Sequence, residues 1–321
     1  MTVVRWSRAE VGEGIPAAAV DDLDDVDVLV LDGVTAADPL AWCVDAPCVV
    51  VAGSPPDAPP PATVDVVIDA GDSGRLDQIV RAVEASPTGA RLLVDVLRTS
   101  RTLDVRRALS VESLAYSTLL ASPPFRSWLE ARAERVSPSF DEPPVRMVRA
   151  ADVLRVTLAR PENRNAFSAV MRDALVEALL VADADISVHV VVDAEGPVFS
   201  SGGDLTEFGT ASDVARAHQI RTHRSVGVLL DRLGPRATIH VKGDCVGAGV
   251  ELPAFAHRVV AAPDTTFRLP EVAMGLIPGA GGTVSLPRRI GRQATAELAL
   301  TGRTMDVDEA LDLGLVDELE T

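Results

Sequence analysis

Three short apolar runs in the first third of the chain predict buried strands. They are Val26–Leu31, Val49–Ala52 and Val64–Ile68, and each is rich in valine or isoleucine. Turn formers and prolines separate them, including the run Pro59-Pro60-Pro61. Residues 1–88 are therefore expected to form a small α/β region.

The spacing of apolar residues becomes helical from about residue 89 to residue 142. Leu109, Leu119 and Leu120 are spread at intervals that a helix can accommodate, and Pro123-Pro124 interrupts the run. A second short helix is expected from Phe125 onward. The proline-rich stretch 137–144 then predicts a linker.

Strands and helices alternate after residue 145, which is typical of an α/β architecture. Ser168 is expected to cap the first helix of this part. The predicted strands are Val153–Leu158, Val188–Val192 and Thr238–Val241, and the predicted helices are Ala169–Val181 and about 211–233.

The charge of the chain excludes several classes of function. The formal net charge is −17 and Lys242 is the only lysine, whereas a nucleic-acid-binding protein would show a basic face. Cys43, Cys48 and Cys245 lack the spacing of a metal site and fit reduced thiols. The chain begins without a signal segment and has no apolar run of roughly 18 residues, the length needed to span a bilayer. We expect a cytoplasmic protein with no membrane, metal or nucleic-acid partner.

Two glutamates stand beside backbone that can leave regular structure. Glu251 ends the run Gly247-Ala248-Gly249-Val250-Glu251, and Glu271 follows Leu269-Pro270. Glycines allow bare N–H groups to approach a ligand closely. Two carboxylates near an anion-binding backbone are what an enzyme that moves protons requires.

These segments resemble the enoyl-CoA hydratase/isomerase (crotonase) family, whose signatures occur here in the family's order. The resemblance implies an α/β fold, a crotonase-like spiral of ββα units, in residues 143–321. The matching segments are Arg160-Pro161 with Asn165-Ala166, Phe199-Ser200-Ser201-Gly202-Gly203-Asp204-Leu205, Gly247–Leu252, Leu269-Pro270-Glu271, Gly275–Gly282, and Leu300-Thr301-Gly302 with Gly314-Leu315-Val316.

The resemblance also implies an acyl-CoA thioester as substrate. Its carbonyl oxygen would lie between the backbone N–H groups of Ser201 and Ala248, an oxyanion hole at the start of a helix. Glu251 and Glu271 would hold a water between them, as in hydratases that convert a 2,3-trans-enoyl-CoA into a 3-hydroxyacyl-CoA. No cofactor is expected, because coenzyme A is part of the substrate, and relatives assemble as trimers or hexamers.

Further residues are expected at the substrate by the same resemblance. Arg164 would lie near the CoA adenine and phosphates, or be an exposed loop arginine, and Asp204 would anchor its own loop. Isomerase, hydrolase and decarboxylase activities, and a non-catalytic subunit, stay open as alternatives to hydration. The expected substrate-binding residues are Arg164, Ala166, Gly202, Asp204, Gly247 and Gly279.

The helices that close the family's active site are not at their usual place after Val316. A segment upstream, from Glu112 through Trp128 to Phe140, resembles them. We expect residues 89–142 to pack over the active site of the 143–321 core, its own or that of a neighbouring subunit. Residues 1–88 are either a shrunken first copy of the fold or an unrelated α/β region, and both interpretations stay open.

Overall fold

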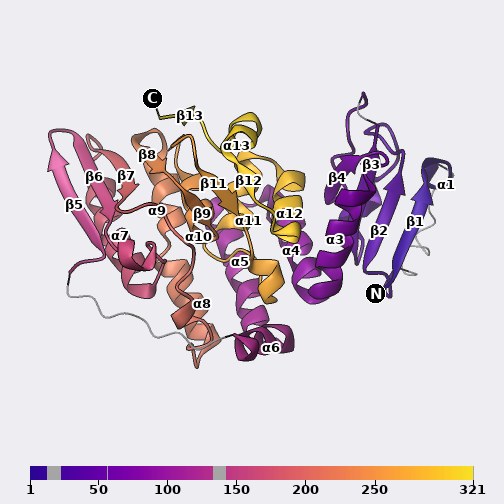
Figure 1. Ribbon diagram of the computed structural model, residues 1–321, viewed down its shortest axis with the longest axis horizontal. Helices are drawn as coiled ribbons and strands as arrows, with labels where there is room; N and C mark the ends of the chain where they lie inside the picture. Colours follow the sequence, from indigo (N-terminus) through magenta and orange to yellow (C-terminus); the bar gives the residue numbers. More distant parts are fainter. Residues whose placement is uncertain (13–22, 56, 133–141, 321) are drawn as a thin grey trace.

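The structure, a computed structural model, describes residues 1–12, 23–55, 57–132 and 142–320. A four-stranded sheet lies at one end of the molecule and strands β5–β7 lie at the other, with helices between them (Figure 1). Most of the expected linker 137–144 falls outside the described residues.

The N-terminal sheet is parallel, with its strands in sequence order. The three expected strands are confirmed as β2, β3 and β4. Strand β1 was not expected, because Arg5 and Ser7 interrupt its apolar run and its side chains are exposed or half-buried. The strands are β1 Val3–Ser7, β2 Val28–Asp32, β3 Val49–Ser54 and β4 Val66–Asp69, and the short helix α1 Arg8–Gly12 follows β1.

Four helices connect this sheet to the rest of the chain. Asp72, Asp104 and Ser122 cap three of them by accepting a backbone N–H of the first turn. Pro123-Pro124 separates two helices as expected and opens the second of them, because proline fits the first helical turn. The helices are α3 Ser73–Ala85, α4 Pro87–Thr99, α5 Val105–Leu120 and α6 Pro123–Ala131.

The larger sheet has six strands in the order β13-β10-β8-β7-β6-β5, and only the β5–β6 pair is antiparallel. A smaller sheet has the order β12-β11-β9. The strands are β5 Val145–Ala150, β6 Val153–Leu158, β7 His189–Ala194, β8 Ala237–Val241, β9 Asp244–Val246, β10 Arg258–Ala261, β11 Thr266–Arg268, β12 Met305–Asp306 and β13 Glu318–Leu319.

The helix expected over 211–233 is two helices. The first ends at His223, and Ser225 caps the second, since its hydroxyl accepts the N–H of Val228. Ser168 caps α7 as predicted. The helices of this part are α7 Ala169–Ala184, α8 Val214–His223, α9 Val226–Leu233, α10 Ala248–Glu251, α11 Gly282–Arg289, α12 Arg292–Thr301 and α13 Val307–Leu313.

One hydrophobic core runs through both sheets. Val28, Val30 and Val51 on one face of the N-terminal sheet belong to the same cluster as the core of residues 145–320. Leu29 and Val50, on the other face of that sheet, belong to a separate cluster. Side chains alternate between the two faces of a strand, so the N-terminal sheet joins the main core with one face only.

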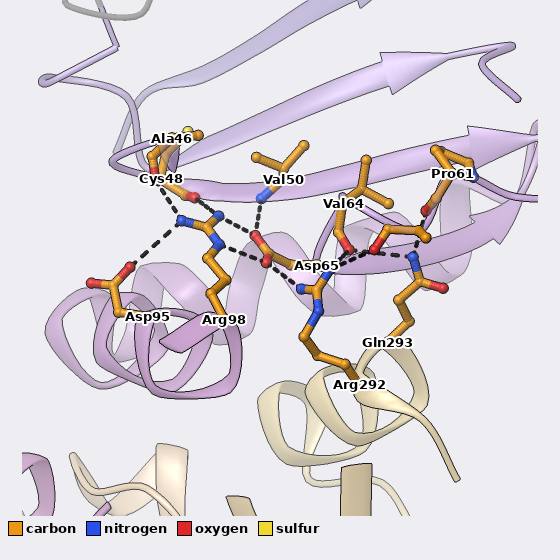
Figure 2. Close-up of polar contacts among 11 residues, drawn as sticks. Ala46, Cys48, Val50, Pro61, Val64, Asp65, Asp95, Arg98, Arg292 and Gln293 are labelled. Atoms are coloured by element: carbon orange, nitrogen blue, oxygen red, sulfur yellow. Dashed lines mark hydrogen bonds and ion pairs between the residues drawn. The ribbon is translucent and has the colours of Figure 1, made fainter. Parts of the chain in front are cut away.

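A buried carboxylate ties the N-terminal sheet to helix α12 (Figure 2). Asp65 is fully buried before β4, and its Oδ2 accepts the backbone N–H of Val50 at 2.9 Å. Its Oδ1 accepts hydrogen bonds from Arg98 of α4 at 2.9 Å and from Arg292 of α12 at 2.8 Å. Arg292 also donates to the carbonyl oxygens of Ala62 and Val64, so a single acid joins three segments that are far apart in sequence.

Replacing Asp65 is therefore expected to loosen the join between the two sheets. Asp65→Asn removes the buried charge that the guanidinium groups of Arg98 and Arg292 share, although Arg98 keeps Asp95 at 3.5 Å. We expect the free energy of unfolding to fall by about 3–5 kcal/mol. Asp32→Asn is the control, because Asp32 pairs with Arg5 on the surface at 3.7 Å and its loss should cost less than about 1 kcal/mol. Equal losses in denaturant titrations would contradict the central role of Asp65.

Candidate active site

A cavity of about 250 Å³ lies between α5 and the core built by residues 145–320. Helix α5 supplies one wall with Leu109, Glu112, Tyr116 and Leu120, which recur at helical spacing on one face. The described part of segment 89–142 therefore lines a cavity of the chain's own core. The opposite wall includes Phe167, Gly203, Ala248, Glu251, Glu271, Gly279 and Ala280.

Glu251 is held by the turn that precedes α11. It lies on the four-residue helix α10, which Gly247 precedes with a left-handed φ of 50°. Its Oε2 accepts hydrogen bonds from the backbone N–H groups of Ala280 at 2.7 Å and Gly282 at 2.8 Å. A side chain at position 282 would lie 2.7 Å from the Glu251 side chain, so glycine is required there.

Glu271 reaches the same cavity through the pairing of β9 with β11. The register of the two strands pairs Arg268 with Val246. Pro270 and Glu271, which follow β11, therefore pass close to Gly247, which follows β9. A Cβ on Gly247 would lie 2.4 Å from Oε1 of Glu271. Oε2 of Glu271 is buried and has no hydrogen-bond partner among the described residues, which leaves it available to a ligand.

A third carboxyl group, that of Glu112, also borders the cavity. It is 2% exposed, and its Oε2 accepts hydrogen bonds from the N–H of Thr283 at 3.0 Å and from its hydroxyl at 2.7 Å. Glu251 is equally buried. Three carboxyl groups thus share one desolvated space.

Burial raises the proton affinity of all three groups, and repulsion by Glu251 adds to it for Glu112 and Glu271. Loss of solvation raises the pKa of Glu251 to about 7, although two N–H groups oppose the shift. Burial, and then the charge of Glu251, raise the pKa of Glu112 to about 8. Burial and the same charge raise the pKa of Glu271 well above its usual range. The two glutamates differ in their donors: two N–H groups stabilise the ionised form of Glu251, whereas Oε2 of Glu271 accepts no hydrogen bond from the described residues.

One expected donor of the oxyanion hole is wrong. The backbone N–H of Ser201 donates to the carbonyl oxygen of Arg164 at 2.9 Å, and Ser201 does not line the cavity. Ala248 begins α10 as expected and lines the cavity, so its N–H belongs to a helix N-terminus.

The other expected substrate residues divide into two groups. Asp204 and Gly279 line the cavity, and Asp204 also anchors its own loop by accepting the N–H and the hydroxyl of Thr206. Arg164 is exposed and pairs with Asp244 at 2.8 Å, outside the cavity lining. Three more expected residues also lie outside the cavity lining: Ala166, Gly202 and Gly247.

Sequence reasoning missed several cavity residues. Arg172, Arg221 and Phe208 line it without belonging to a recognised motif. Glu112 was noticed only as part of the segment that resembles closing helices. The available signal was an acidic residue within the otherwise apolar stripe Leu109, Tyr116 and Leu120 of a predicted helix.

Two surveys of the described residues concern other kinds of site. No three histidine, cysteine or acidic side chains within them are placed so that they could hold a metal ion. No helix in the part of the chain that the structure describes is long and apolar enough to cross a membrane.

Known sequences identify the family to which the larger part of the chain belongs. The sequence model described as "Enoyl-CoA hydratase/isomerase" matches residues 149–320, more than half of the chain. The chain belongs to the enoyl-CoA hydratase/isomerase family. The family resemblance inferred from the sequence motifs is thereby confirmed.

Solved structures confirm the fold class. An enoyl-CoA hydratase from Thermoplasma volcanium has a TM-score of 0.51 and 31% identity, covering 56% of this chain and 72% of that chain. An enoyl-CoA hydratase of Mycobacterium smegmatis also has a TM-score of 0.51, with 33% identity over 56% of this chain and 70% of that chain.

Curated relatives match mainly the second half of the chain's length. A 2,3-dehydroadipyl-CoA hydratase of Escherichia coli is 33% identical over 52% of this chain and 65% of its own length, which is less than two thirds. A cyclohexa-1,5-dienecarbonyl-CoA hydratase of Thauera aromatica is 33% identical over 62% of this chain and 69% of its own length. Helix α5 lies upstream of the matched residues 149–320.

Residues 143–321 expressed alone are expected to be insoluble or inactive. Without α5 the cavity loses a whole wall, and the apolar surface under that helix becomes exposed to water. Sedimentation and a hydration assay, run beside the full chain, test this. A soluble and fully active 143–321 protein would show that the upstream half is dispensable for the site.

Proposed function

We propose that this protein hydrates a 2,3-trans-enoyl-CoA thioester to a 3-hydroxyacyl-CoA. The observation that carries the proposal is the pair of carboxyl groups, Glu251 and Glu271, that border one cavity beside the N-terminus of α10. Both groups sit in a desolvated place, which costs stability. A purely structural subunit would have no physical need of them.

The difference in hydrogen-bond donors suggests a role for each glutamate, since only the ionised form of Glu251 is stabilised by two backbone N–H groups. Glu251, with a pKa of about 7, would take a proton from water as its oxygen bonds to Cβ. Glu271, whose pKa burial and the charge of Glu251 raise well above its usual range, would give its proton to Cα. The carbon–carbon double bond becomes single, and a proton returning from Glu251 to Glu271 completes the cycle.

The negative charge that develops on the thioester oxygen needs two donors. Ala248 would supply one N–H, strengthened by the helix terminus. We propose Gly203 for the other, in place of Ser201. The N–H of Phe167 donates to the carbonyl oxygen of Gly202, and its carbonyl oxygen accepts the N–H of Asp204. In such a parallel pairing the N–H of the residue between them, Gly203, points away from Phe167. Gly203 also lines the cavity.

Hydration is favoured over the other reactions of the family by the presence of both carboxyl groups. The reaction is redox-neutral and requires no cofactor beyond the coenzyme A of the substrate. Isomerisation uses the same oxyanion hole and the same transfer of a proton at Cα, so the substrate assay should also follow movement of the double bond. A cytoplasmic location and a trimeric or hexameric assembly remain proposals.

We also propose that α5 and α6 serve in this chain as the closing helices of the fold. Phe125 of α6 is buried and stacks on Trp128, and both rings contact Phe208 of the core. The division into 1–88, 89–142 and 143–321 follows from this assignment. Whether residues 1–88 descend from a first copy of the fold stays a hypothesis.

Removing either acid–base group should abolish most turnover. Glu251→Gln and Glu271→Gln are each expected to lower kcat for hydration by on the order of 100-fold or more, while binding of a saturated acyl-CoA is largely kept. Loss of conjugated thioester absorbance across a panel of enoyl-CoA substrates measures this. Hydration near the wild-type rate in either variant would refute the two-glutamate mechanism.

The oxyanion hole can be tested at a single backbone atom. Proline is accepted at the first position of a helix, so Ala248→Pro removes the N–H while α10 can persist. We expect kcat to fall by about 10²–10³-fold, whereas the control Ala248→Gly keeps the donor and should stay active. A folded Ala248→Pro protein with normal turnover would mean that the carbonyl oxygen binds elsewhere.

A further inference from the structure

Glu112 enters the site from a part of the chain that the family's sequence model does not match. That model covers residues 149–320, and Glu112 lies on α5, Val105–Leu120. Its side chain is nonetheless buried like that of Glu251, and it lines the same cavity as Glu251 and Glu271. A buried acid is costly unless it is paired or protonated, so its presence requires an explanation.

The contacts of Glu112 fall on the segment that holds Glu251. Thr283, the second residue of α11, gives Glu112 both its N–H and its hydroxyl. The N–H groups of Ala280 and Gly282, immediately before it, go to Glu251. Residues 280–283 thus donate hydrogen bonds to two carboxyl groups, one on α10 and one on α5.

The charged and titratable groups near Glu112 and on its helix's neighbours come from several elements. The charge of Glu251 on α10 opposes the ionisation of Glu112. The charge of Glu112 in turn opposes the ionisation of Glu271, which follows β11. Arg221 on α8 bonds to Ser113 and Ser117 of α5, and its guanidinium lies 5.1 Å from the Tyr116 ring. His218 of α8 also contacts Ser113, and Arg288 of α11 bonds to Leu103.

We propose that Glu112 is a positioning residue of this site, which holds the 280–283 segment against Glu251 and sets the protonation of the Glu251–Glu271 pair. This inference rests on the proposed hydratase function for its catalytic consequence. Three carboxyl groups in one desolvated cavity cannot all ionise near neutral pH, and their protons come off as a coupled set. Glu112 therefore keeps the set more protonated than a pair would be.

Glu112→Gln separates the charge from the contacts. The amide oxygen can still accept from Thr283, but no charge can form, so Glu251 and Glu271 should lose their protons at lower pH. We expect the kcat–pH profile to move down by about one pH unit, with maximal kcat changed only a few-fold. An unmoved profile would overturn the proposed effect on protonation.

Glu297→Gln is the matched control for that experiment. Glu297 is also a largely buried glutamate, but it bonds to Arg303 and does not line the cavity. Its replacement should leave the kcat–pH profile in place even where the melting temperature falls. A shift of the same size in both variants would show a general effect of losing a buried acid and would overturn the proposal.

Glu112→Leu tests the positioning part. Leucine cannot accept the Thr283 donors, so residues 280–283 lose one of their two anchors, and kcat should fall about tenfold below that of Glu112→Gln. The KM for the same enoyl-CoA should change less than kcat. Equal kcat values in the leucine and glutamine variants would show that the hydrogen bonds to Thr283 position nothing.

A measurement of stability against pH does not depend on turnover. The pKa of Glu112 is raised from its ordinary 4.5 to about 8 by burial and by Glu251, so the folded state holds this proton more tightly than the unfolded one. The wild-type protein should therefore lose stability as pH rises from about 5 to about 8. Glu112→Gln should lose less, so that its melting temperature rises relative to wild type over that interval.

These two readouts separate the failure of the inference from the failure of the proposed function. A protein that hydrates no enoyl-CoA, but whose stability follows the expected pH dependence, would refute the hydratase assignment and keep Glu112 in the coupled cluster. Hydration with matching pH profiles and parallel stability curves for wild type and Glu112→Gln would refute the role of Glu112 alone.

Discussion

The turn at residues 280–283 must satisfy two buried carboxyl groups at once, and the site depends on this constraint. Glu251 takes two of its N–H groups and Glu112 takes the N–H and hydroxyl of Thr283. A buried carboxylate needs such donors because it has lost its hydration. The donors lie at the start of α11, whose orphan N–H groups need acceptors in turn. The carboxyl groups supply the acceptors that these N–H groups need, and the N–H groups supply the donors that the buried carboxyl groups need.

That contact joins the upstream half of the chain to the family core. Asp65, Arg98 and Arg292 fix the N-terminal sheet to α12, and α3 and α4 continue the shared core from there to α5 (Figures 1 and 2). Buried ion pairs contribute little net stability, but they are sensitive to the loss of one partner. Arg98 lies on α4, which packs against α5, so these ion pairs connect the N-terminal sheet to the neighbour of the helix that carries Glu112.

Close backbone approach explains the glycines of the motifs better than flexibility does. Gly247 and Gly282 leave room for the carboxyl groups of Glu271 and Glu251, which a Cβ at either position would displace. Both carboxyl groups therefore contact backbone atoms where water would otherwise solvate them. The same proximity raises their proton affinity, so the packing that shapes the cavity also makes its acids chemically useful near neutral pH.

The sequence alone determined the family, the strands β2–β4 and β6–β8, the capped helix α7 and the pair Glu251 and Glu271; it did not predict the edge strands β1, β5 and β13, nor β10. The predicted features are local: apolar runs, a capping serine, and glycines beside an acid are legible in a few consecutive residues. Tertiary structure decided the rest. Ser201 lost its expected role because the carbonyl oxygen of Arg164 takes its N–H, and the helix over 211–233 broke where Ser225 caps α9. Glu112 joined the site across 171 residues of sequence, and no local pattern shows which distant backbone a buried acid will meet.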